Sequence, residues 1–124
     1  AWANTEYSRI MDPVCIAVFN GIKAVAEKLN QDLNSLDINL NNAMKALASA
    51  WVSDSRWPPA PTSPGRFNVR ESLDDLYSAN DFIAKAMDDG KIAEKKGIYS
   101  PSLMKTQIAA IDKLLMEKKY FGEE

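Results

Sequence analysis

Apolar residues recur every three or four positions along most of this chain, and this spacing most limits what the chain can fold into. In the first half they are, in order, Val14, Val18, Ile22, Val25, Leu29 and Leu33. A repeat near 3.6 residues places side chains on one face of an α-helix, whereas a half-buried strand alternates with a period of two. No segment of the sequence alternates over a length sufficient for a strand. We therefore expect an all-α fold.

Capping signals indicate where the first helix begins. Asp12 followed by Pro13 predicts a start there, because aspartate caps free amides and proline suits the first helical position. Residues 1–11 are then expected to form an N-terminal arm outside the main bundle. Gly21 falls in the middle of the predicted helix, where glycine costs about 1 kcal/mol relative to alanine. A neighbouring element packed closely against Gly21 would account for its presence.

The apolar spacing continues without a change of phase as far as Trp51, so residues 13–52 have two interpretations. Asparagine, serine and aspartate are concentrated between residues 30 and 42, and they favour caps and turns over helix interiors. We prefer a break near residues 34–38, followed by a second helix through Val52. One unbroken helix is the alternative.

Two further helices are predicted in the second half of the chain. Asn68, with a glutamate three residues later, has the spacing of a reciprocal N-terminal cap. The helix that follows is expected to end at Gly90, because glycine can adopt the left-handed conformation that closes a helix. After a basic connector over residues 91–99, Ser100 and Pro101 repeat the cap-then-proline start. The prediction is a bundle-like domain of four helices, with a long Pro-rich crossover loop between the second and the third.

Size and composition fit a single helical domain over residues 1–124. The chain has 124 residues, 46% apolar and 26% charged, which is the balance of an ordinary globular domain. Residues 53–67 hold four prolines and a glycine, which excludes regular structure there. No apolar run approaches the ~18 residues that a membrane span requires. Because the chain begins with alanine, export after signal removal is as compatible with the sequence as a cytoplasmic location.

Residue types that are absent exclude several kinds of chemistry. The sequence contains no histidine, which removes the commonest general base and the commonest zinc ligand. Its one cysteine, Cys15, lies in the first apolar stripe and is expected to be an inert core residue, with a reactive thiol as the minor alternative. The acidic pairs at residues 74–75 and 88–89 diverge by about 100° on a helix, so neither pair converges on one water or ion. We expect no enzyme activity, no metal and no cofactor.

The Pro-rich loop is the most distinctive segment and the predicted partner-binding site. Arg56, Trp57 and Pro58 open a stretch that resembles a polyproline recognition motif without its full spacing, and Phe67 closes it. Either the two aromatic side chains pin a stiff crossover to the bundle, or they anchor a partner. Trp2 likewise either folds back onto the bundle or docks on another chain.

Charge is distributed unevenly along the chain, although its net value is only −2. Residues 66–90 carry three positive and six negative side chains, whereas residues 91–121 carry seven positive and three negative. This asymmetry suits head-to-tail self-association or a charged protein partner, and nucleic acid is a minor option. The leading hypothesis is a non-enzymatic protein–protein interaction module, an adaptor or an assembly subunit. The alternative is a carrier that binds an apolar small molecule between its helices, lined by Phe19, Met44, Tyr77, Met87 and Met104.

Overall fold

The computed structural model of the protein describes residues 2–52, 69–94 and 98–118. In this part of the chain it contains four α-helices: α1 (Trp2–Lys28), α2 (Ile38–Val52), α3 (Val69–Asp89) and α4 (Pro101–Lys118). The predicted all-α class with four principal helices is therefore confirmed. The predicted Pro-rich loop over residues 53–67 lies outside the described residues.

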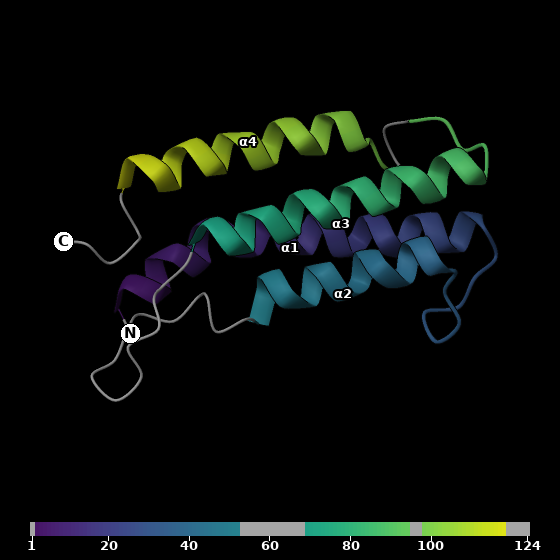
Figure 1. Cartoon of the computed structure of the whole chain (residues 1–124), viewed down its shortest axis with the longest axis horizontal. Helices are drawn as coiled ribbons and strands as arrows, with labels where there is room; N and C mark the ends of the chain where they lie inside the picture. The colour runs from purple at the N-terminus through teal and green to yellow at the C-terminus, as the bar shows by residue number, and fades with distance from the viewer. Residues whose placement is uncertain (1, 53–68, 95–97, 119–124) are drawn as a thin grey trace.

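The helices pack side by side along one long axis (Figure 1). Helices α1 and α3 run in one direction, and α2 and α4 run in the other. Helices α1 and α3 contact each other and both outer helices, and the contact between α2 and α3 is the most extensive. Since α2 and α4 flank the central pair on opposite sides, α4 is held by α1 and α3.

Each helix contributes the predicted apolar stripe to one core. Its largest fully buried side chains are Met11, Val18, Ile22, Val25, Leu40, Leu47, Leu73, Leu76, Ile83, Ile108 and Leu115. Cys15 is also fully buried, as expected for a core residue. Leu33 was predicted to continue the α1 stripe, but it lies beyond the helix and is 44% exposed.

The predicted start of the first helix was wrong. Helix α1 begins at Trp2 and contains Pro13, so the segment expected to be a separate arm over residues 1–11 is largely helical. The reason lies in packing on both sides of the proline. Met11 is fully buried before it and Val14 is buried after it, while Pro13 itself is exposed. Burial of these side chains offsets the hydrogen bond that a proline removes from a helix interior.

The break between the first two helices is confirmed, and two hydrogen-bonded caps produce it. After Lys28 the chain turns at Asn30, whose φ of 58° is left-handed. The amide of Gln31 donates to the carbonyl of Ala26 at 2.8 Å, which closes the end of α1. Asp37 then caps α2, because its side chain accepts a hydrogen bond from the Leu40 amide at 2.8 Å. The break therefore spans residues 29–37, somewhat earlier than predicted.

The end of α3 also differs from the prediction. The left-handed residue is Lys91, with a φ of 58°, and not Gly90. The Ile92 amide donates to the carbonyl of Met87 at 2.8 Å and completes the cap. A Cβ at Gly90 would overlap a terminal methyl of Leu29, which is the flexible end of a half-buried side chain. Leu29 therefore packs in the space that a side chain at position 90 would take.

The start of α4 is confirmed at Ser100 and Pro101, with an additional cap from the connector. The Leu103 amide donates to the Ser100 hydroxyl at 3.2 Å. The Ser102 amide donates to the carboxylate of Glu94 at 2.7 Å, and the Ser102 hydroxyl donates to the same carboxylate at 2.9 Å. These hydrogen bonds, the backbone one foremost, lower the pKa of Glu94. A carboxylate also suits the positive end of the helix dipole.

The tyrosine that precedes α4 packs directly against α1. A Cβ at Gly21 would overlap the ring of Tyr99, so the close approach anticipated for this glycine is present. Tyr99 is only 7% exposed, and its hydroxyl donates to the side-chain oxygen of Asn80 at 2.7 Å. The Asn80 amide group donates in turn to the carbonyl of Pro101 at 3.0 Å. Tyr99 and Asn80 thereby supply hydrogen-bond partners for each other's buried polar groups, which would be costly to bury without them.

Candidate functional site

The predicted partner-binding residues lie where the structure describes no side chain. Arg56, Trp57, Pro58 and Phe67 all lie outside the described residues. Trp2 is the first residue of α1, and its side chain lies outside those described. Partner binding at these five positions therefore stays a prediction.

The residues proposed for an apolar carrier site belong mainly to the packed core. Met87 and Met104 are buried, at 2% and 7% exposure. Phe19, Met44 and Tyr77 are half-buried and pack against the same core. Recesses open on the described surface beside Lys23 and beside Lys91, and none of these five side chains lines them.

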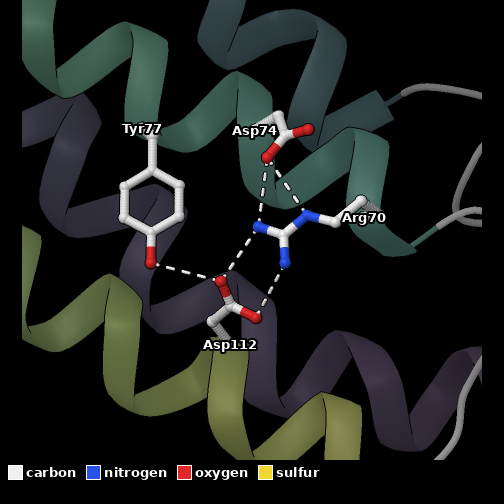
Figure 2. A network of polar contacts seen from close by, with 4 residues as sticks. All are labelled: Arg70, Asp74, Tyr77 and Asp112. Carbon is white, nitrogen blue, oxygen red and sulfur yellow. Dashed lines mark hydrogen bonds and ion pairs between the residues drawn. The ribbon is translucent and has the colours of Figure 1, made fainter.

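A polar cluster, the Arg70 clamp, joins α3 to α4 (Figure 2). Both terminal nitrogens of Arg70 donate to the carboxylate of Asp112, at 3.0 and 2.9 Å. The Tyr77 hydroxyl donates to the same carboxylate at 3.2 Å, and Arg70 also contacts Asp74 at 3.0 Å. The hydrogen bond to Asp112 raises the pKa of Arg70, and burial raises the pKa of Tyr77. Because the guanidinium of Arg70 lies between a carboxylate of its own helix and one of α4, the clamp ties α3 to α4.

The clamp predicts that the two carboxylates around Arg70 differ in their effect on stability. We expect Asp112→Ala to lower the free energy of unfolding by about 1 kcal/mol, because it removes a bidentate partner of which only 17% of the side chain is exposed. Asp74→Ala is the matched control. It removes a partner of the same arginine that is 63% exposed, and the expected loss is under about 0.5 kcal/mol. Urea titration of both variants measures the difference, and equal losses would contradict the assignment.

The outer face of α3 is strongly acidic. Its exposed carboxylates belong to Glu71, Asp74, Asp81, Asp88 and Asp89. The face includes one exposed lysine, Lys85, whose ammonium lies 5.7 Å from the centre of the Phe82 ring. At the helix end Asp89 accepts a hydrogen bond from the side chain of Asn39 at 2.9 Å. The acidic half of the predicted charge asymmetry thus forms one exposed helical face.

A recess with the opposite charge lies at the end of the bundle where α1 and α3 finish and α4 begins (Figure 1). We call it the end recess. It measures about 360 Å³ and is open to solvent. Its lining combines two lysines with apolar side chains: Lys28, Lys91, Leu29, Ile92, Ala93 and Ile98. Leu29, Ile92 and Ile98 are half-buried and continuous with the core, whereas both lysines are exposed.

The caps described above give the end recess its shape. Asn30 and Lys91 turn the chain sharply at the ends of α1 and α3, and Gly90 allows Leu29 to approach. The same caps supply hydrogen bonds to carbonyls of the last turns, including those of Ala26 and Met87. Partial negative charge at the two helix ends is thereby reduced.

The recess beside Lys23, on α1, is flatter than the end recess, and its lining includes side chains of both charges. It measures about 460 Å³, and Lys23, Glu27 and Gln31 contribute to its lining. Its lining therefore carries both signs of charge, whereas the charged side chains that line the end recess are both lysines.

Sequence reasoning identified part of the end recess and missed the rest. The sequence predicts the basic connector over residues 91–99. Ile92 and Ile98 within it follow no helical period, so the apolar spacing does not single them out. The one sequence signal for these two isoleucines is that they flank the charged residues 94–96.

Other kinds of site find no support among the residues that the structure describes. No three side chains of His, Cys, Asp or Glu gather there in a way that could hold a metal ion. Across the same residues, no helix has the length and apolar character needed to cross a bilayer. Comparison of the chain with protein-family models, curated proteins and solved structures gives no match.

Proposed function

We propose that the protein is a non-enzymatic helical interaction module that binds another polypeptide, or a second copy of itself, as part of an assembly. The observation that carries this proposal is the end recess, where half-buried Leu29, Ile92 and Ile98 are bordered by Lys28 and Lys91. An apolar floor with a charged rim is the arrangement of a protein-binding pocket.

The openness of the end recess favours a polypeptide over a small molecule. Small-molecule sites typically bury 70–90% of their ligand, whereas both lysines that line the end recess are exposed. A side chain presented by a second chain needs burial only at its tip, because its backbone stays at the rim. Exposed apolar side chains elsewhere, including Leu103 at 53% and Leu114 at 39% on α4, add apolar surface to the described part of the molecule.

Site-specific photo-crosslinking tests this proposal. Benzoylphenylalanine placed at Ala93, an exposed residue of the end recess, should form adducts with a polypeptide, both in expressing cells and in the concentrated purified protein. The same group at Ala109, exposed on α4, is the matched control and should give several-fold less. If Ala93 yields no polypeptide adduct beyond the Ala109 level under either condition, the proposed function is wrong.

A further inference from the structure

We propose that the end recess binds residues 120–124 of a second copy of this chain, so that copies join head to tail. This inference rests on the proposed function and names the partner. The segment reads Tyr-Phe-Gly-Glu-Glu, two adjacent aromatic residues followed by two acidic ones. The match with the end recess is chemical: an aromatic side chain fits the apolar floor, and the glutamates fit the lysine rim.

The charges around the end recess decide the orientation of the segment. Lys28 and Lys91 lie at the rim, while the acidic residues Asp88 and Asp89 are exposed on the last turn of α3. Asp89 accepts a hydrogen bond from Asn39 of α2, and Glu94 accepts hydrogen bonds from Ser100 and Ser102 at the start of α4. An acidic segment is therefore expected to place Glu123 and Glu124 beside the two lysines and away from α3.

Chain length excludes binding within one molecule. Helix α4 has 18 residues and is about 27 Å long, and it starts beside the end recess and finishes at the opposite end of the bundle. Tyr120 and Phe121 follow the last residue of α4 by two and three positions, which spans at most about 11 Å of extended chain. Neither aromatic side chain can return to the recess beside the start of its own α4. The occupant must come from another copy.

This geometry makes the contact heterologous. Each copy offers the end recess at one end of the bundle, whereas α4 finishes at the other end and residues 120–124 follow α4 in the sequence, so the two surfaces in contact differ. Such contacts propagate into open chains unless the rotation between copies closes a ring. Association is therefore expected to continue beyond the dimer as concentration rises.

Two full-length variants remove one half of the contact each. Lys28→Glu with Lys91→Glu reverses the rim charge, and Tyr120→Ser with Phe121→Ser removes the aromatic anchors. Light scattering over a concentration series should show wild-type mass rising with concentration, and at least tenfold weaker association for each variant. Lys45→Glu with Lys113→Glu, both exposed and outside the recess, makes the same change in net charge and should associate like the wild type. Circular dichroism checks that each variant remains folded.

Mixing the two defective variants gives the decisive result. The rim variant keeps its segment and the aromatic variant keeps its recess, so an equimolar mixture should form a dimer of twice the monomer mass and stop there. A mixture that stays monomeric, wild-type association by either variant, or a wild-type chain that remains monomeric throughout would overturn the inference. Adducts between Ala93 and a different protein would do so as well while leaving the proposed function intact.

Discussion

Replacing Tyr99 with alanine is expected to lower the free energy of unfolding by about 3–5 kcal/mol, the usual loss when a large buried aromatic side chain is truncated. The side chain fills the space left by Gly21 and donates a hydrogen bond to Asn80, so both apolar contact and polar pairing are lost. Burial also raises the pKa of Tyr99, so its hydroxyl stays protonated as a donor well into alkaline pH. Urea denaturation followed by circular dichroism measures the change.

Two milder substitutions separate the contributions to that loss. Tyr99→Phe keeps the ring and removes only the hydroxyl, with an expected loss of about 1–2 kcal/mol because the Asn80 oxygen loses its partner. Ile98→Ala, at the half-buried neighbour, should be less severe than Tyr99→Ala. If Tyr99→Ala costs no more than Ile98→Ala, the ring is not an essential part of the core.

The second large effect concerns Gly21, where helix propensity and packing predict opposite signs. Alanine in place of a mid-helix glycine should stabilise the helix by about 1 kcal/mol on propensity alone. Because its Cβ would overlap the Tyr99 ring, we expect Gly21→Ala to destabilise the protein by about 1–3 kcal/mol instead. Thermal and urea unfolding measure the change.

A double-mutant cycle identifies the cause. In a Tyr99→Ala background the overlap is gone, so Gly21→Ala should become neutral or stabilising by up to about 1 kcal/mol. The reversal of sign is the informative result. If Gly21→Ala destabilises equally in both backgrounds, the glycine is required for a reason other than the ring.

The sequence predicts the helices well and their ends less well, because tertiary contacts decide where the helices begin and end. Periodicity depends only on which residues are apolar, so the four helices follow from it directly. Pro13 was misassigned as a helix start because burial of Met11 and Val14 outweighs a local proline signal. Gly90 was assigned to a left-handed cap because its contact with Leu29, sixty-one positions earlier, has no local signature.

The candidate site was harder to predict than the fold for a similar reason. The end recess combines the end of α1 with a connector that begins beyond α3, and nothing in either segment alone indicates that they meet. The predicted site at Arg56 and Trp57 relied on local composition, and it remains a prediction. By contrast, the mid-helix position of Gly21 was enough to predict that a neighbouring element packs closely against it. Tyr99 makes that contact.

The close packing at Gly21 also limits how far α1 can slide along its neighbours. Gly21 lies under the Tyr99 ring, and Gly90 lies against Leu29, just beyond the end of α1. A shift of α1 by one turn, about 5.4 Å, would bring Ala17, Val18, Ala24 or Val25 to the position of Gly21 and force a side chain into the ring. A stripe of similar aliphatic residues fits several registers almost equally well, so the apolar pattern alone does not select one. Gly21 penalises shifts of one turn in either direction, so the register of α1 follows in part from where a side chain is missing.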